Sequence, residues 1–261
     1  MIENNLLNTM QNKLVVEQAP FPFISTKNIL PNNLIKEAEN EFINFNKLEN
    51  AGGYRYGNLK RKFSDFQKLP PRIKEIVSFF YSNDFIKILE NKFKLNGIEP
   101  DWELHGGGMH QSPRGGFLKV HSDFIYKRKS NTRRVLNLLL YLNSDWKDEW
   151  GGALELWDKQ MTKICKSIYP NSNNIIIFRT DKNSNHGFPD PLSCPENITR
   201  KSIALYYYVK EKPLFPISIK LRKYYTTVWK KRPNVEESSF ADQDGLWRRI
   251  KYKYLPRIFK N

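Results

Sequence analysis

The sequence of 261 residues is poor in cysteine and histidine, with two of the first and four of the second. Cys165 and Cys194 are far apart and neither belongs to a C-x-x-C pair, so the chain encodes neither a disulfide framework nor a closed zinc site rich in cysteine. Free thiols are the ordinary state in a reducing compartment. We therefore expect a cytoplasmic protein with both cysteines reduced.

Long hydrophobic runs are also absent. The apolar runs VLNLLLYL and IIIF are far shorter than the roughly 18–20 residues that a membrane-spanning helix needs. The N-terminal stretch MIENNLLNTMQNK has an early acid and no sustained apolar region, which is not the pattern of a secretory signal. We expect no transmembrane segment.

Acidic residues are outnumbered, with 27 Asp and Glu against 43 Lys and Arg, which gives a formal net charge of +16. Such a surplus attracts anionic partners, such as nucleic acid, an acidic surface or a small anion. The basic residues are spread along the chain rather than gathered in one run. An anionic partner, nucleic acid included, therefore stays open beside the alternative that the charge serves solubility.

Periodicity divides the chain into three parts of a single domain: residues 1–99, 100–212 and 213–261. The first part is a mainly helical support. It contains PNNLIKEAENEFINF with Asn32 or Asn33 as candidate N-cap, then PPRIKEIVSFFYS, then NDFIKILENKFKL with Asn83 as candidate N-cap. The last part is a basic extension, in which Leu246, Ile250, Tyr254 and Ile258 stand at helical spacing. Such a helix packs on its own domain or touches a membrane surface or RNA.

From about residue 100 the pattern changes to short runs that are rich in leucine, aromatic and β-branched residues. These runs are DWELH, GFLKVHSDF, RRVLNLLLYL, GALELW, NNIIIFRT and RKSIALYYYV, separated by turn clusters. Six short strands at this spacing favour a sandwich or barrel over βαβ units. We therefore predict an α+β fold with a mainly β core and helices packed on it.

The triplet His121-Ser122-Asp123 ends one of these strands. Side chains two residues apart on a strand point to the same face, so the imidazole and the carboxylate can hold one ion. His186, after the strand NNIIIFRT, can supply a third ligand. Two histidines and one carboxylate with open positions are typical of non-haem Fe(II) oxygenases. The alternative is a chance triplet on the surface, because His-x-Asp alone is a weak signal.

Two strands carry further polar residues on one face. Arg200 and Ser202 are two apart, and an arginine fork beside a hydroxyl suits a carboxylate. In RRVLNLLLYL one alternate set is Asn137, Leu139 and Tyr141, while the other is entirely leucine. The polar set predicts ligand contacts inside a β-rich cup. The alternatives are a solvated strand end for Arg200 and a solvent-facing side of the sheet for Asn137 and Tyr141.

At this point the residues carry a resemblance. GGFLKVHSD, LLLYLNSDWKDEWGGALELW, NHGF and TRKSIALYYY, in this order, resemble the catalytic core of the iron(II)/2-oxoglutarate-dependent dioxygenases, in their prolyl 4-hydroxylase-like branch. The resemblance covers about residues 100–210. It implies a double-stranded β-helix, which is a jelly-roll or cupin-like core, and this agrees with the predicted strands.

The resemblance implies roles for named residues. His121, Asp123 and His186 would be the catalytic ligands of Fe(II), and Arg200 would bind the distal carboxylate of 2-oxoglutarate with help from Ser202 or Tyr141. Asn137, Leu154 and Phe188 would line the cosubstrate pocket. Relatives have an upstream tyrosine where this chain has MHQSP, so His110 or Gln111 would take that place. The segment between His186 and Arg200 is also longer than in many relatives.

The implied reaction is hydroxylation of an unactivated C–H bond with O2, giving succinate and CO2 as co-products, with ascorbate as a supporting reductant. The branch favours a prolyl residue in a peptide or protein, or a proline-like amino acid. Hydroxylation of a small metabolite or a sugar-linked intermediate is the alternative within enzymes. A catalytically inactive binding module on the same scaffold is the alternative of another class.

Five basic residues directly follow the triplet: Lys127, Arg128, Lys129, Arg133 and Arg134. In the implied fold this loop lies near the mouth of the cup. We expect either a basic rim that receives an anionic partner, such as an acidic peptide, a phosphorylated sugar or a nucleic-acid backbone, or a simply solvated turn.

Overall fold

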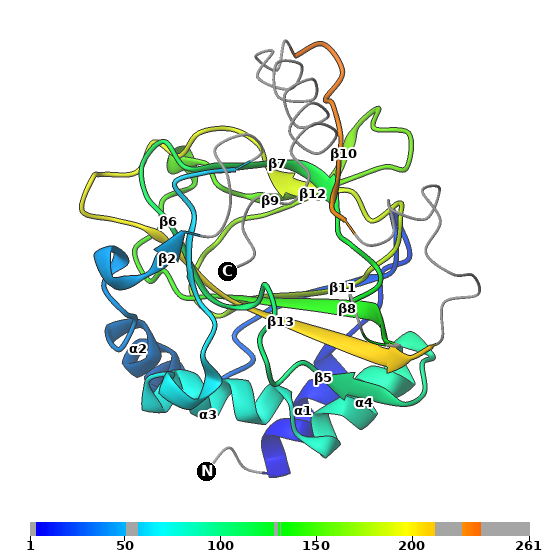
Figure 1. The fold of residues 1–261 in the computed structure, drawn as a ribbon. Helices are drawn as coiled ribbons and strands as arrows, with labels where there is room; N and C mark the ends of the chain where they lie inside the picture. The colour runs from blue at the N-terminus through cyan, green and yellow to red at the C-terminus, as the bar shows by residue number, and fades with distance from the viewer. Residues whose placement is uncertain (1–3, 51–56, 128–129, 131, 212–225, 236–261) are drawn as a thin grey trace, which may run out of the picture.

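A computed structural model describes residues 4–50, 57–127, 130, 132–211 and 226–235. In these ranges two antiparallel sheets face each other, and four α-helices lie below the larger sheet (Figure 1). This is the α+β arrangement with a double-stranded β-helix core that the sequence predicts, so the expected fold class is confirmed.

The larger sheet has eight strands among the described residues, in the order β1-β11-β8-β13-β6-β4-β2, with β5 paired to β13. Its strands are β1 (Phe23–Lys27), β2 (Glu49–Asn50), β4 (Arg61–Phe63), β5 (Ile98–Pro100), β6 (Gly108–Ser112), β8 (Thr132–Tyr141), β11 (Asn174–Arg179) and β13 (Arg200–Lys210). The longest two, β8 and β13, pair along nearly their whole length and form the middle of the sheet.

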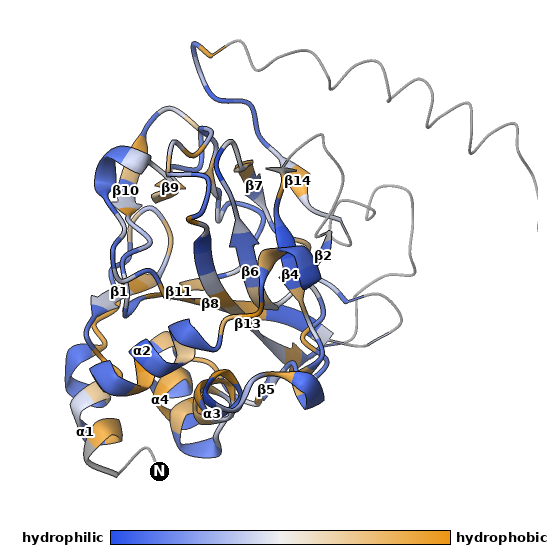
Figure 2. Cartoon of the chain, turned by 90° about the vertical axis from the view of Figure 1, so that its left-hand side faces the viewer, coloured by the Kyte–Doolittle hydropathy of each residue, from blue (hydrophilic) through white to orange (hydrophobic). Residues whose placement is uncertain are grey.

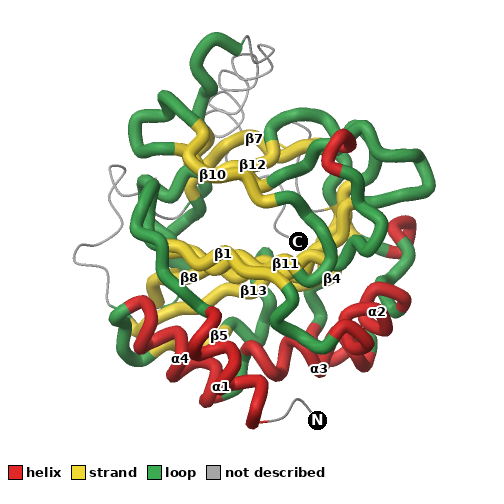
Figure 3. Tube along the Cα trace, turned by 180° about the vertical axis from the view of Figure 1, so that it is seen from behind, coloured by secondary structure: helices red, strands yellow, loops and turns green. Residues whose placement is uncertain are grey.

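The smaller sheet has six strands within the same ranges, in the order β10-β9-β12-β7-β14, with β3 paired to β7. They are β3 (Gly57–Asn58), β7 (Phe117–Ser122), β9 (Leu154–Trp157), β10 (Ile164–Ile168), β12 (His186–Phe188) and β14 (Val228–Trp229). Viewed from behind, the two layers of strands lie one above the other, with the helices outside the larger one (Figure 3).

The helices cover the outer face of the larger sheet. They are α1 (Asn4–Lys13), α2 (Asn32–Asn40), α3 (Pro71–Phe80) and α4 (Asn83–Phe93), with short 3-10 helices at Phe45–Lys47, Phe66–Lys68 and Asp148–Trp150. Their apolar faces meet the leucines of β8, and hydrophobic residues gather at this layer (Figure 2). Leu136, Leu138, Leu140 and Leu142 are all fully buried there, so the leucine set of β8 forms the core, as predicted.

Helix ends differ from the sequence expectation in detail. Pro31 occupies the N-cap of α2 without a side-chain hydrogen bond, so Asn32 begins the helix instead of capping it. Ser82, rather than Asn83, caps α4 by accepting a hydrogen bond from the Phe85 amide. Helix α2 ends at Asn40, before the last two apolar residues of the predicted stripe.

Residues 1–99 supply more than helices, because β1, β2, β3 and β4 extend the two sheets. The prediction of a strand at DWELH is wrong: turns lie at residues 102–103 and 105–106, and β5 precedes them. The backbone amide of His105 donates to the Asp101 carboxylate at 2.8 Å, and this local contact favours a turn over a strand.

Three further expectations concern the cysteines, a membrane-spanning helix and the C-terminal part. Cys165 is exposed, Cys194 is buried, and both are free. None of the helices in the described ranges has the length and apolar content to cross a membrane. The helical stripe expected at Leu246–Ile258 lies outside the described residues.

Candidate active site

The two histidines of the predicted triad lie on neighbouring strands. Strands β7 and β12 pair with His121 and His186 as direct Cα partners. Asp123 follows the last residue of β7, so its carboxylate turns back toward both rings. The register of one strand pair therefore brings together ligands that are distant in the sequence.

The triad is compact. Nε2 of His121 lies 3.6 Å from Oδ1 of Asp123, and Nε2 of His186 lies 3.7 Å from Oδ2 of the same carboxylate. The imidazole centroids are 4.5 Å apart, and one ligand atom from each residue lies within 4.8 Å of the others. Among the described residues this is the group of histidine, cysteine and acid side chains that could hold a metal ion.

The backbone fixes the orientation of both rings. Nδ1 of His121 contacts the carbonyl oxygen of Lys119, and Nδ1 of His186 that of Ser184, each at 2.8 Å. A carbonyl only accepts, so Nδ1 carries the proton and Nε2 presents its lone pair to the centre of the triad. Burial, and then the neighbouring His121, lower the pKa of His186 to about 4, so this imidazole is neutral at physiological pH.

Asp123 is held as a carboxylate. Burial acts to raise its pKa, but Arg134 and the two imidazoles together hold it well below its usual range. Nδ2 of Asn137 donates to Oδ2 of Asp123 at 2.6 Å, and Nη1 of Arg134 lies 3.2 Å from the same oxygen. Two neutral nitrogen donors and one anionic oxygen on one side of a centre fit Fe(II).

Arg200 lies on β13, in the same cavity, and is 5% exposed. Its Nε donates to the carbonyl of Gly152 at 2.8 Å, and Nη2 donates to the hydroxyl of Tyr141 at 3.1 Å. The guanidinium also lies 4.3 Å from the ring centre of Phe188. No carboxylate pairs with Arg200 within the described ranges, so this buried cation is suited to an incoming anion.

Two glycines permit the close contacts of this site. A Cβ on Gly152 would lie 2.6 Å from Leu192 and 3.1 Å from Cδ of Arg200, so a side chain there would displace the guanidinium. A Cβ on Gly187 would lie 2.8 Å from the Leu118 carbonyl, which would push β12 and its His186 away from β7. The GG and NHGF motifs therefore require glycine at these two positions, because a larger side chain would clash with its neighbours.

The cavity has a volume of about 250 Å³ and lies between the sheets. Ser202, Asn137, Leu154 and Phe188, which the sequence names as pocket residues, line this cavity. Tyr141 lies behind this lining, fully buried, and reaches the site through its hydrogen bond to Arg200.

The expectation for Gln111 is not met. On β6 its neighbours His110 and Ser112 line the cavity, so the alternation of the strand turns Gln111 to the other face. There Nε2 of Gln111 bonds the Ile43 carbonyl at 2.5 Å, and Thr199 donates to its Oε1 at 2.8 Å. Of the two candidates named from the sequence, His110 is the one at the pocket.

Arg134 is the residue whose position differs most from the sequence prediction. It is 1% exposed and lies between the rings of Phe124 and Tyr206, 3.9 Å from each centroid. The register of β8 against β13 shifts between Arg134 and Leu136, so Val135 is an extra residue. This bulge turns Arg134 into the cup, although simple alternation puts it with the leucines.

In the expected basic rim, the basic side chains that the structure describes are therefore already paired with acidic residues. Besides Arg134, Lys127 pairs with Asp101 at 3.2 Å and also with Glu103, and Arg133 pairs with Glu211. Arg128 and Lys129 lie outside the described residues. The cavity has other lining residues without a sequence signal: Lys60, Phe178, Tyr206, Thr227 and Trp229.

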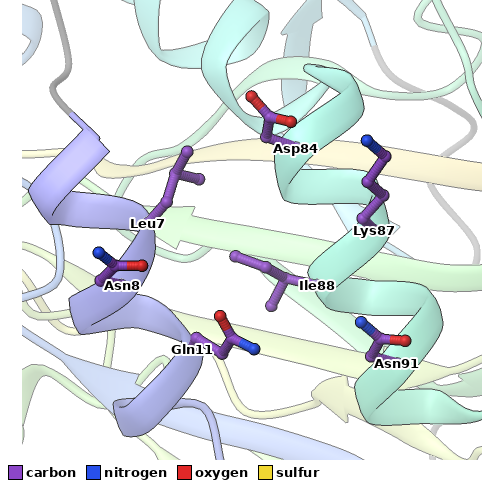
Figure 4. Close-up of a pocket in the computed structure, with 7 residues that line it drawn as sticks. All are labelled: Leu7, Asn8, Gln11, Asp84, Lys87, Ile88 and Asn91. Atoms are coloured by element: carbon purple, nitrogen blue, oxygen red, sulfur yellow. The ribbon is translucent and has the colours of Figure 1, made fainter.

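A second hollow lies on the helix layer, away from the triad. It is lined by residues of α1 and α4 that face each other across the groove (Figure 4): Leu7, Asn8, Gln11, Asp84, Lys87, Ile88 and Asn91. No group of metal ligands lies there. The chemistry of the described residues is concentrated in the cavity between the sheets.

A model of the 2OG-Fe(II) oxygenase superfamily matches residues 107–208, the stretch that contains the triad and Arg200. This stretch is a 2OG-Fe(II) oxygenase domain. Fe(II) and 2-oxoglutarate are the cofactors of such a domain, and the donor set of the triad fits the metal.

Solved structures of prolyl hydroxylases share this fold at low sequence identity. A prolyl 4-hydroxylase from Pseudomonas putida has a TM-score of 0.51 and 12% identity, covering 80% of this chain and 98% of that one. A prolyl hydroxylase from Trichoplax adhaerens, in complex with a peptide fragment of the hypoxia inducible factor oxygen degradation domain, has a TM-score of 0.53 and 17% identity, covering 78% and 88%. No curated protein matches the chain in sequence.

Proposed function

We propose that this oxygenase hydroxylates an unactivated C–H bond of a prolyl residue in a peptide or protein, or of a proline-like amino acid. One observation carries the proposal: a complete triad with its carboxylate ligand and a buried arginine without an acid partner open onto the same cavity. In related halogenases a small residue replaces the acid, so Asp123 favours hydroxylation. Succinate and CO2 are the co-products.

Each residue has a role that follows from its contacts. His121, Asp123 and His186 hold the iron, because their three donor atoms converge on one point. Asn137 and Arg134 orient the carboxylate of Asp123 and hold it deprotonated. When bound, Fe(II) and 2-oxoglutarate supply the oxidising power that places one atom of O2 in succinate and the other in the substrate.

The cosubstrate is held by the larger sheet. Arg200 receives the distal carboxylate of 2-oxoglutarate, and Tyr141 and the Gly152 carbonyl fix the guanidinium in place. Ser202 adds a hydroxyl to the lining, and Leu154 and Phe188 add apolar walls. These walls exclude water, which strengthens every charged contact in the cavity.

The prolyl substrate is supported by the shared fold of the Pseudomonas and Trichoplax enzymes, which are prolyl hydroxylases. The peptide in the Trichoplax complex supports a peptide as one class of substrate. Against the inactive-module alternative, all three ligands and Arg200 are present and buried or nearly buried. A module without chemistry would not need three ligand atoms that converge on one point beside a buried arginine.

An anaerobic titration tests this function. Purified apo-protein receives Fe(II) and then 2-oxoglutarate, while the visible metal-to-ligand charge-transfer band is followed. We expect a saturable band, and then formation of succinate with hydroxylated product when O2 and proline-containing peptides or proline are added. A folded protein that gives no band would contradict the proposal.

A further inference from the structure

The ionisable side chains of the cavity do not balance in charge. Among its described lining residues, Lys60, Arg134 and Arg200 are cationic, and Asp123 is the carboxylate. His110 is neutral, since burial lowers its pKa, and His121 and His186 are the neutral nitrogen ligands of the metal. Fe(II) with two positive charges and 2-oxoglutarate with two negative charges cancel, so the loaded cavity keeps an excess of positive charge.

Lys60 is the cation without a role in the proposed chemistry. It lies between β3, which pairs with β7, and β4, which pairs with β6, so its segment crosses from one sheet to the other beside the triad. Its side chain is half-buried and lines the cavity. No acid forms an ion pair with Lys60 in the described residues, and the surrounding charges are Arg200, Asp123 and Lys62.

Burial and then Arg200 lower the pKa of Lys60 to about 8, so the ammonium is still largely protonated at pH 7. A cation that is held in a partly closed cavity beside another cation is costly unless an anion joins it. Asp123 does not fill this place, because it faces Arg134 and would share its charge with the metal. An anion from outside the chain is therefore needed near Lys60.

Arg134 adds to the same field from another side of the triad. Its Nε and Nη1 are buried and make no hydrogen bond with the described residues. Aromatic rings above and below leave the edge of the guanidinium as its polar side. Asp123 is the counter-charge of Arg134, so Lys60 is the cation that a neutral substrate would leave uncompensated.

We infer that the substrate brings a carboxylate into the cavity and that Lys60 receives it. This rests on the proposed function and narrows it: the substrate is a free amino acid of proline type, rather than a prolyl residue inside a peptide, where the carboxylate is an amide. The small cavity agrees, because about 250 Å³ lies below the roughly 300–1,000 Å³ of pockets for larger ligands. Lys60 is a specificity-determining residue in this reading.

The test compares acids with their amides. Protein loaded with Mn(II), as an inert substitute for Fe(II), and 2-oxoglutarate is titrated calorimetrically with L-proline, pipecolic acid and the standard L-amino acids, and with the corresponding carboxamides. We expect at least one acid to bind about 10- to 100-fold more tightly than its amide, as for a charge-assisted contact. A panel in which no acid binds, or in which amides or prolyl peptides bind as well as acids, overturns the inference.

Variants assign the carboxylate to Lys60. In Lys60→Gln the acid that binds should lose its advantage over the amide, while 2-oxoglutarate binding is unchanged, and Lys60→Arg should keep most of the advantage. Lys62→Gln is the matched control, because Lys62 is also half-buried and two residues away but does not line the cavity. If Lys60→Gln weakens 2-oxoglutarate instead, Lys60 serves the cosubstrate and the inference is wrong.

The charge-transfer titration separates the two levels of failure. If Fe(II) and 2-oxoglutarate give no band, the proposed function is wrong, and so is this inference, which rests on it. With a normal band and no preference for acids over amides, only the carboxylate site fails. Thermal melting of each Lys60 variant against the parent verifies that a loss of binding is not a loss of fold.

Discussion

The two faces of the paired strands β8 and β13 do different work on the same backbone. Toward the helices, β8 presents leucines and β13 presents Ile203, Leu205 and Tyr207, all without exposed surface. Toward the smaller sheet the same strands present Asn137, Arg200 and Ser202. The apolar face stabilises the sheet through burial, and that stability allows the opposite face to hold buried cations and unpaired polar atoms.

The largest expected effect is on the polar face, in Asp123→Ala. Loss of the carboxylate removes one metal ligand and leaves Arg134 buried without its counter-charge. We expect metal content to fall to background and turnover to fall by at least about three powers of ten, or about 4 kcal/mol. Mass-spectrometric metal analysis and succinate formation measure both. Metal retained at the parent level would show that Asp123 is not a ligand.

Neighbouring leucines on β8 provide a direct comparison of the two faces. Leu138 is fully buried against the helices, whereas Leu139 is half-buried and lines the cavity. Leu138→Ala should lower the free energy of unfolding by about 2–5 kcal/mol, because a cavity is left in the core. Leu139→Ala should cost less stability and should change the KM values of the surviving activity. Urea denaturation and steady-state kinetics separate the two effects.

Equal losses of stability in Leu138→Ala and Leu139→Ala would contradict the proposed difference between the two faces of β8. They would mean that the cup side of β8 is packed as tightly as the helix side. Unchanged KM values in Leu139→Ala would mean that its side chain does not touch the bound molecules, although it lines the empty cavity.

The sequence predicts much of this division of residues between the two faces. Strict alternation on VLNLLLYL assigns each leucine and Asn137 to the correct face, because a strand with one dry face must keep its register. Spacing of two residues on a strand points to His121 with Asp123 and to Arg200 with Ser202, while His186 is indicated by its position after the strand NNIIIFRT. Strand pairing then brings the site residues of β7, β12 and β13 together. The order of the motifs along the sequence implies this pairing.

Other features could not be predicted from the pattern. The bulge at Val135 adds one residue, and that shift moves Arg134 from the leucine face to the cup. Lys60 belongs to a segment with no periodic signal, and it lines the site only because β3 and β4 pair with different sheets. Gln111 and His110 are adjacent, so choosing between them requires the true register of β6.

Arg200→Ala tests the second charged group of the polar face. The iron ligands do not contact Arg200, so metal binding should be retained. Loss of the guanidinium should weaken 2-oxoglutarate by about 1.5–3 kcal/mol, which is roughly 10- to 150-fold in Kd. The charge-transfer titration reports both quantities, and Arg200→Lys, which keeps the charge without the fork, should fall between the two. Unchanged cosubstrate affinity would contradict the assignment of Arg200.

Tyr141→Phe is the smallest change and tests whether the buried residues behind the lining act through position. The variant keeps the ring beneath the guanidinium and removes the hydroxyl that accepts from Nη2 of Arg200. One hydrogen bond is worth about 0.5–1.5 kcal/mol, so the KM for 2-oxoglutarate should rise by roughly 2- to 10-fold with kcat nearly unchanged. In an Arg200→Ala background the same substitution should add little, because the bond is already gone. Full additivity of the two changes would mean that Tyr141 contacts the cosubstrate directly and does not act by holding Arg200.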